Sequence, residues 1–166
     1  MFVLVSIASI AKSDLSGKYV MRLRSNDQLY FILPNDIESL DKNKNLNFDI
    51  TYATSEQDVT INMSIFTKQG LTIDSIAFVS TKDVVIKDFK TFYIEKDNAW
   101  WCHRISCKLP FEYLKQMYLS SESYKIVVYD DLKVLTYAFP VKKWKSEHSW
   151  MNRLLLLITQ NLTNRR

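Results

Sequence analysis

Alternation of apolar and polar side chains dominates the chain between residues 45 and 67. Every second position is apolar in two segments, first as Leu46, Phe48, Ile50 and Tyr52, then as Val59, Ile61, Met63 and Ile65. Successive side chains of a strand point to opposite faces, so both segments are predicted to be half-buried strands. One buried face and one wet face are typical of an antiparallel sheet.

Eight further segments are short, β-branched or aromatic, and closely spaced, which predicts additional strands. They are Tyr19–Arg24, Gln28–Leu33, Ile73–Val79, Val84–Ile86, Thr91–Glu95, Ala99–Ser106, Tyr124–Tyr129 and Lys133–Phe139. A longer loop is expected from Pro34 to Asn45, with a short helical turn around Ile37–Leu40. Successive hairpins favour a meander or a sandwich over crossover units of strand, helix and strand.

Two segments carry a helical period instead. Apolar residues at 111, 114, 117 and 118 directly after Pro110 predict a short helix near residues 111–119. Apolar positions at spacings of three and four predict a C-terminal helix near residues 146–162. Ser146 is the expected N-cap, and Glu147 suits the positive first turn.

These elements predict an all-β or β-dominated α+β fold, built as an antiparallel β-sandwich or a partly open barrel. Residues 12–166 are expected to form a single β-rich domain, because nothing in the sequence indicates a linker or an internal repeat. The C-terminal helix is broad in its apolar face, and packing on the sheet is favoured over docking on a partner.

Residues 1–11 read MFVLVSIASIA, an apolar run that ends in the small residues typical of a signal-peptide cleavage site. No basic residue precedes the run, so a first β-strand rich in Val and Ile is the alternative. The signal is favoured, which predicts a secreted or periplasmic protein; a cytoplasmic location is the alternative.

Composition narrows the chemistry. The chain of 166 residues holds only two glycines, so a glycine-rich phosphate loop is excluded. Asn and Asp fill the predicted turns instead, as in Asp97-Asn98, because both tolerate left-handed backbone. Aromatic residues reach 13%, which makes exposed aromatic side chains the main candidates for ligand contact.

Positive charge is concentrated at the C-terminal end. Residues 141–166 hold six basic residues (Lys142, Lys143, Lys145, Arg153, Arg165 and Arg166) and one acidic residue, while the other 140 hold 16 basic and 17 acidic residues. The favoured interpretation is a solvated helix face with cations near the negative, C-terminal end of the helix dipole. Attraction of nucleic acid or of anionic lipid is the alternative.

Catalytic signals are sparse. The only histidines are His103 and His148, and no nucleophile elbow or zinc-protease motif is present. Cys102 and Cys107 lie on one predicted strand, about 16 Å apart, which is too far for a disulfide. Two free thiols and no bound metal are therefore expected.

Trp100 and Trp101 are adjacent in a predicted strand, so their side chains leave opposite faces. If Trp101 joins the core, Trp100 lies beside Cys102 and Arg104 on the other face. A Trp next to an Arg could stack on a sugar, a base or a partner's side chain. The favoured alternative is that the C-terminal helix covers Trp100.

The sequence thus predicts a non-enzymatic binding or structural module of an exported bacterial-type protein. The candidate binding residues are Trp100, Arg104, Lys142, Lys143, Lys145 and Arg153. A protein or glycan partner is expected, no cofactor is expected, and nucleic acid or an anionic membrane surface is less favoured. The alternatives are an intracellular inhibitor or neutralising protein and, third, an enzyme that uses carboxylates.

Overall fold

The computed structural model describes residues 15–25, 27–39, 45–131 and 133–163. Ten strands and two helices follow one another along these residues. In order they are β1 (Tyr19–Leu23), β2 (Gln28–Ser39), β3 (Asn45–Ala53), β4 (Asp58–Thr67), β5 (Ile73–Val79), β6 (Val84–Ile86), β7 (Phe89–Asp97), β8 (Trp100–Pro110), α2 (Phe111–Leu119), β9 (Lys125–Asp130), β10 (Lys133–Ala138) and α3 (Val141–Thr163). The signal-peptide prediction for residues 1–11 lies outside the described part of the chain.

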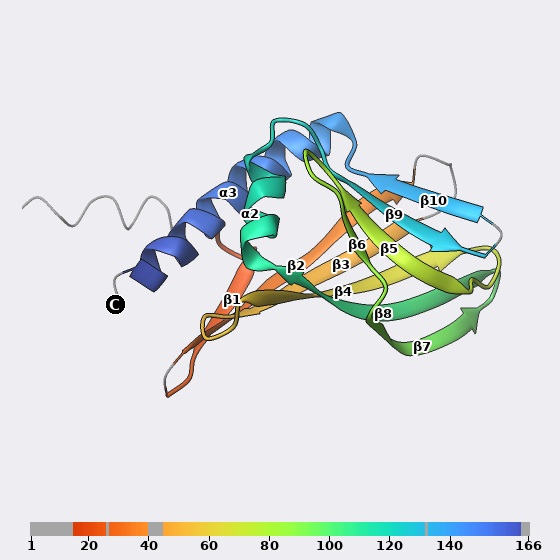
Figure 1. Ribbon diagram of the computed structural model, residues 1–166, viewed down its shortest axis with the longest axis horizontal. Coiled ribbons are helices and arrows are strands. Elements are labelled where there is room, and N and C mark those ends of the chain that lie inside the picture. The colour runs from red at the N-terminus through yellow and green to blue at the C-terminus, as the bar shows by residue number, and fades with distance from the viewer. Residues whose placement is uncertain (1–14, 26, 40–44, 132, 164–166) are drawn as a thin grey trace, which may run out of the picture.

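The strands form an antiparallel path in the order β6-β5-β9-β10-β2-β3-β4-β8-β7, with β1 paired to β2. Among the described residues, β10 pairs with the end of β2 through Tyr137 with Ser39 and Ala138 with Glu38. At this junction the path folds into two layers, seen one above the other in Figure 1. The two strands at the ends of the path, β6 and β7, do not pair with each other, so the described strands form an open sandwich and not a closed barrel. The prediction of a β-dominated α+β fold is confirmed.

One local prediction is wrong. Over residues 34–39 the structure has no loop or helical turn, because β2 continues through Pro34 to Ser39 and Ile37 is buried opposite Leu46. The rest of the predicted loop, residues 40–44, lies outside the described part of the chain. A register shift between Ile32 and Asn35 accommodates the proline. Pro34 lies within this irregular stretch of the β2–β3 pairing, and a bulge is one of the positions where a sheet tolerates a missing N–H.

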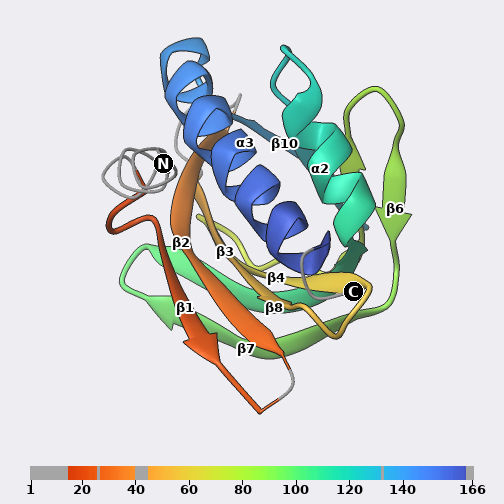
Figure 2. The same ribbon diagram turned by 90° about the vertical axis from the view of Figure 1, so that its left-hand side faces the viewer.

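Both helices occupy the open end between the two layers, as the view in Figure 2 shows. Their apolar faces point inward and meet the inner faces of the strands. An aromatic cluster joins these parts, and its members are Phe48, Tyr118, Tyr124, Phe139 and Trp144. Its residues come from β3, α2, α3 and the segments flanking β9 and β10, so one core serves both layers and both helices.

The turn between β7 and β8 confirms the role expected for asparagine. Asn98 has a φ of 53°, in the left-handed region that glycine usually fills. Its side-chain amide donates to Asp97 Oδ1 at 2.9 Å, which ties the turn locally. A chain with two glycines can therefore still form a tight hairpin here.

Candidate functional site

The strand alternation of β8 divides its side chains between two environments. His103, Ile105 and Cys107 are buried on the inner face, whereas Trp100 and Arg104 lie on the outer face and are partly exposed. Trp101 starts the inward-facing set at the strand end and is half-buried. The predicted division of the two tryptophans between opposite faces is therefore what the strand shows.

The expectation that the C-terminal helix covers Trp100 is not what the structure shows. The helix α3 lies at the open end, on the inner side of the layers, and β8 begins at the far end of the sandwich (Figure 1). The reason is connectivity: α3 follows β10 in the other layer, and its apolar stripe is buried between the layers. The outer face around Trp100 is left without a helix over it.

Trp100 lines a shallow pocket on this outer face, which we call the Trp100 pocket. Its volume is about 360 Å³, and its lining residues are Asn45, Asn47, Phe66 and Trp100. They come from the neighbouring strands β3, β4 and β8. Lys68 Nζ lies 5.9 Å from the centroid of the Trp100 ring, so a cation stands at the edge of the pocket. The pocket thus combines two aromatic rings, two amides and a nearby ammonium group.

Arg104 is held by its neighbours on the same face. Its Nη2 forms an ion pair with Asp49 Oδ2 at 2.6 Å, and its Nη1 donates to Ser64 Oγ at 2.9 Å. Asn62 Nδ2 donates to the other oxygen of Asp49 at 2.8 Å. The guanidinium therefore bridges β8, β4 and β3 beside the pocket, and it organises the outer face instead of standing open for a ligand.

The two cysteines and His103 lie in surroundings typical of residues with a structural role. Cys102 and Cys107 are both free cysteines, and burial raises the pKa of the Cys107 thiol to about 12. His103 is buried and accepts a hydrogen bond from the backbone N–H of Leu71 at 3.2 Å, and burial lowers its pKa. The Cys107 thiol therefore stays protonated at neutral pH, and His103, about 13 Å away along the same strand, is too far to act as its base.

The four remaining candidate residues are split by the structure. Lys142, Lys145 and Arg153 line a cavity of about 500 Å³ together with Lys18, whereas Lys143 is outside the lining. We call this feature the basic cavity. Ser146, Ser149 and Trp150 complete its wall. Spacings of three and eight residues, close to one and two helical turns, place the three α3 cations on one helix face.

The start of α3 corrects the sequence prediction. The helix begins at Val141, and the carbonyl of Pro140 accepts the N–H of Trp144 at 2.8 Å. Buried Trp144 extends the apolar stripe one turn earlier than Ser146, which explains the shift. Ser146 therefore does not cap the helix, and Glu147 is buried in its second turn.

This correction reverses the electrostatic interpretation of the lysines. Lys142 and Lys143 lie in the first turn and Lys145 directly after it, at the positive end of the helix dipole, and the first turn contains no acid. Cations there raise the local positive potential further. The prediction that the basic residues sit near the negative end is wrong for these three, while Arg165 and Arg166 lie beyond the described residues.

A further cavity is lined by carboxylates. Its volume is about 700 Å³, and Glu56, Asp58 and Glu112 are among its lining residues. None of the three is buried, and Glu112 is paired with Lys115 at 2.8 Å. A general acid at neutral pH needs a carboxyl in water-poor surroundings, and this cavity offers none.

Lys18, Asn47 and Phe66 were not predicted as site residues. Phe66 could have been recognised from the sequence, because it is an apolar residue on the solvent-exposed face of an alternating strand. Asn47 lies on the wet face of its own strand among other polar residues and is not distinguishable from them by pattern. Lys18 is more than a hundred residues from α3, so only the fold brings it to the basic cavity.

Metal ligation and membrane spanning find no support among the described residues. No three side chains of His, Cys, Asp or Glu among them are grouped as metal ligands would be. No helix in the same ranges combines the length and hydropathy of a membrane span. No protein-family model, no curated protein and no solved structure matches this chain, so its function is inferred from its own residues.

Proposed function

We propose that the protein is a non-enzymatic binding module that takes a saccharide in the Trp100 pocket, within an exported bacterial-type protein. The observation that carries the proposal is the pairing of Trp100 and Phe66 with Asn45 and Asn47 on a sheet face that no helix covers. Export rests on the signal-like residues 1–11 alone.

The chemistry of the pocket matches a sugar. A pyranose ring has faces of C–H groups and a rim of hydroxyls. Aromatic rings supply flat apolar surface for the faces, and an asparagine amide supplies both donors and an acceptor for the rim. A few polar groups on a mainly apolar wall are typical of small-molecule sites.

A glycan array probed with the labelled protein tests the proposal. We expect binding to a subset of glycans, and Trp100→Ala should weaken it by at least about tenfold, because a Trp anchor carries a large share of such contacts. Tyr129→Ala is the matched control, since Tyr129 is an exposed aromatic residue on the other layer. No glycan bound, or equal loss in both variants, would contradict the proposal.

A protein partner is the second candidate, favoured by the open edge of β7. This strand pairs only with β8, and Phe92, Tyr93 and Ile94 are 51%, 47% and 52% exposed. An unpaired edge with apolar side chains can accept a strand from another chain. In this case Ile94→Lys should abolish the interaction and Trp100→Ala should leave it intact.

The two candidates also differ in location. N-terminal sequencing of the protein from its native host separates them. Cleavage after Ala11 supports the exported binding module, whereas an intact Met1 in the soluble cytosol supports the intracellular interaction protein.

A further inference from the structure

The basic cavity is a second site, distinct from the Trp100 pocket. It lies against the first half of α3, and Lys18, which directly precedes β1, joins the α3 residues in its lining. Its volume of about 500 Å³ falls within the range of small-ligand pockets. Four cationic side chains from two separate segments converge on it, namely Lys18, Lys142, Lys145 and Arg153.

Among the described residues, the acid that acts electrostatically on these lysines is Glu147, whose pKa is raised by burial and lowered to a smaller extent by the charge of Lys18. Within the described ranges, Lys18, Lys142 and Lys145 take part in no ion pair. The start of α3 adds the positive end of the helix dipole to the same place. Positive charges held together at a cost in mutual repulsion are stabilised when an anion binds between them.

The wall of the cavity is fixed rather than loose. Trp150 is 6% exposed, its Nε1 donates to Glu147 Oε2 at 2.9 Å, and Lys18 Nζ lies 5.4 Å from its ring centroid. Arg153 Nη2 donates to Ser149 Oγ at 3.0 Å, which orients the guanidinium along the helix face. Glu147 is not part of the lining and is buried against Trp150, so its carboxylate does not fill the cavity.

We propose that the basic cavity binds a phosphate group, carried either by a small ligand or by a lipid headgroup. Several cationic side chains around one cavity favour a multiply charged oxyanion such as phosphate over a single carboxylate. Lysine ammonium groups and a guanidinium donate charge-assisted hydrogen bonds to such oxygens, and the hydroxyl of Ser146 is a further donor in the wall.

Titration calorimetry with inorganic phosphate and with pyrophosphate tests this assignment. The site variant carries Lys142→Gln and Lys145→Gln. The control variant carries Lys87→Gln and Lys108→Gln, which removes the same charge from exposed positions elsewhere. We expect pyrophosphate affinity to fall by at least about tenfold in the site variant and to stay unchanged in the control, because each lost charge-assisted bond weakens binding strongly.

A second arm identifies the source of the phosphate. Flotation is measured with phosphatidylcholine vesicles that contain or lack phosphatidic acid. Binding of pyrophosphate in solution supports a small ligand. Binding only to vesicles that contain phosphatidic acid supports a lipid headgroup, provided that the site variant no longer binds these vesicles. Amide shifts at Ser146 and Ser149 should accompany either result.

Three outcomes would overturn the proposal: no binding in either arm, equal weakening in site and control variants, or shifts confined to other residues. Unchanged thermal midpoints of both variants exclude misfolding as the cause. The glycan experiment on Trp100 is independent, because it concerns a different face of the molecule, so failure of one proposal leaves the other standing.

Discussion

Glu147 is a carboxylate placed in an environment that disfavours its charge. The residue is 9% exposed, its Oε2 accepts the indole N–H of Trp150, and its Oε1 has no hydrogen-bond partner among the described residues. Burial raises its pKa from 4.5 to about 7, against the opposing effects of the Trp150 bond and the charge of Lys18. The folded protein therefore holds a proton that the unfolded chain releases.

This proton makes stability depend on pH. Between the unfolded pKa of 4.5 and the folded pKa of about 7, the folded state binds more protons, so stability falls as pH rises and the loss is complete above about 7. The shift corresponds to about 3 kcal/mol. Glu147→Gln should remove this loss of stability. The variant should therefore unfold at a higher temperature than the wild type at about pH 8 and at nearly the same temperature as the wild type at about pH 5.

Thermal unfolding followed by circular dichroism at both pH values checks the prediction. Glu122→Gln is the control, because Glu122 is exposed in the segment between α2 and β9 and should keep the wild-type pH dependence. If the thermal midpoint of the Glu147→Gln variant changed with pH as that of the wild type does, a group other than Glu147 would be responsible for the pH dependence.

Among the elements, α3 has two faces with different tasks. One face is buried, with Trp144, Met151, Leu154 and Ile158 packed between the layers, and the other carries the basic cavity. Each of the three lysines at the N-terminal end destabilises the helix by about 0.3–1 kcal/mol, because its charge is repelled by the positive end of the helix dipole. Burial of the apolar face outweighs this cost, because each fully buried aliphatic side chain contributes about 1.5–3 kcal/mol. A binding function can thus be carried by an element that the core holds in place.

Leu155 and Leu156 are adjacent on α3, one on its buried side and one on its exposed side. Leu155 is 3% exposed and Leu156 is 60% exposed. Leu155→Ala should lower the free energy of unfolding by about 2–5 kcal/mol, because it removes buried methyl groups and leaves a cavity. Leu156→Ala should change it by less than about 0.5 kcal/mol. Urea unfolding measures both, and similar small values would mean that α3 is a docking helix instead of part of the core.

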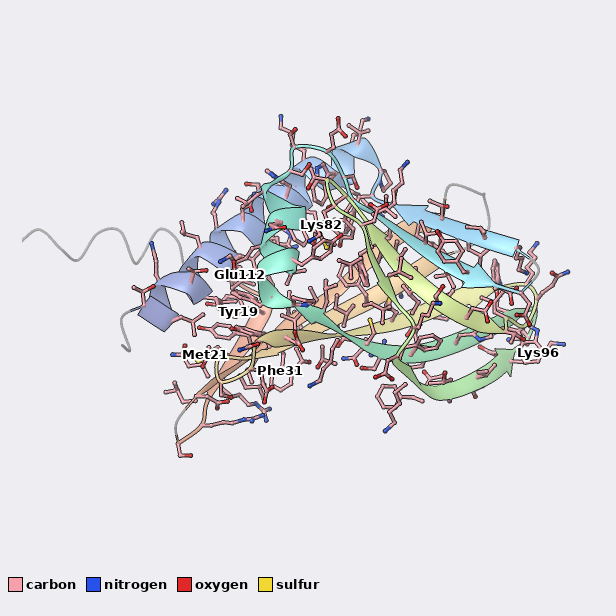
Figure 3. All side chains as sticks on the ribbon, viewed as in Figure 1. Tyr19, Met21, Phe31, Lys82, Lys96 and Glu112 are labelled. Carbon is pink, nitrogen blue, oxygen red and sulfur yellow. The ribbon has the colours of Figure 1, made fainter. Side chains whose placement is uncertain are left out.

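The β1–β2 ribbon is another element with exposed apolar surface. In Figure 3 it projects from the sandwich beside the end of α3, with Met21 and Phe31 on it, whereas Lys96 lies at the opposite end of the molecule. β1 pairs with β2 alone, and Arg22 lies over the ring of Phe31 at 5.8 Å. Charged residues on such an edge discourage pairing with other chains.

At the scale of the whole molecule, the aromatic cluster connects all the parts. The ring centroids of Phe48 and Phe139 are 6.3 Å apart, and those of Phe139 and Trp144 are 5.6 Å apart. Tyr118 and Tyr124 place their hydroxyls 3.0 Å from each other inside the core, and burial raises the pKa of both. Neither layer can lose its partner without exposing this cluster.

Unfolding should therefore be a single cooperative transition. We expect near-ultraviolet and far-ultraviolet circular dichroism to give the same midpoint, since both report one core. Phe139→Leu should shift both midpoints together and cost about 1–3 kcal/mol, while Phe92→Leu on the exposed edge should cost less than about 0.5 kcal/mol. Two separate transitions would show that the layers unfold independently.

Local sequence patterns were sufficient to predict most of the helices and strands. Alternation at Leu46 to Tyr52 predicted β3, and the spacing after Pro110 predicted α2, because strand and helix periods depend on side chains that are neighbours in sequence. The continuation of β2 through Pro34 was missed, because a bulge beside a change of partner strand depends on residues far along the chain. The earlier start of α3 was missed because Trp144 becomes a core residue only through contacts with Tyr118 and Phe139.

The sequence by itself determined the strand-rich class, the two helices, the opposite directions of Trp100 and Trp101, and the concentration of positive charge near the C-terminal end. Those properties follow from periodicity and composition, which are local. Only the tertiary structure decided that α3 packs inside the sandwich, that Trp100 is left on an open face, and that Lys18 joins Lys142 and Lys145. The physical reason is that burial and cavities arise from contacts between segments distant in sequence, and no local pattern encodes which segments will meet.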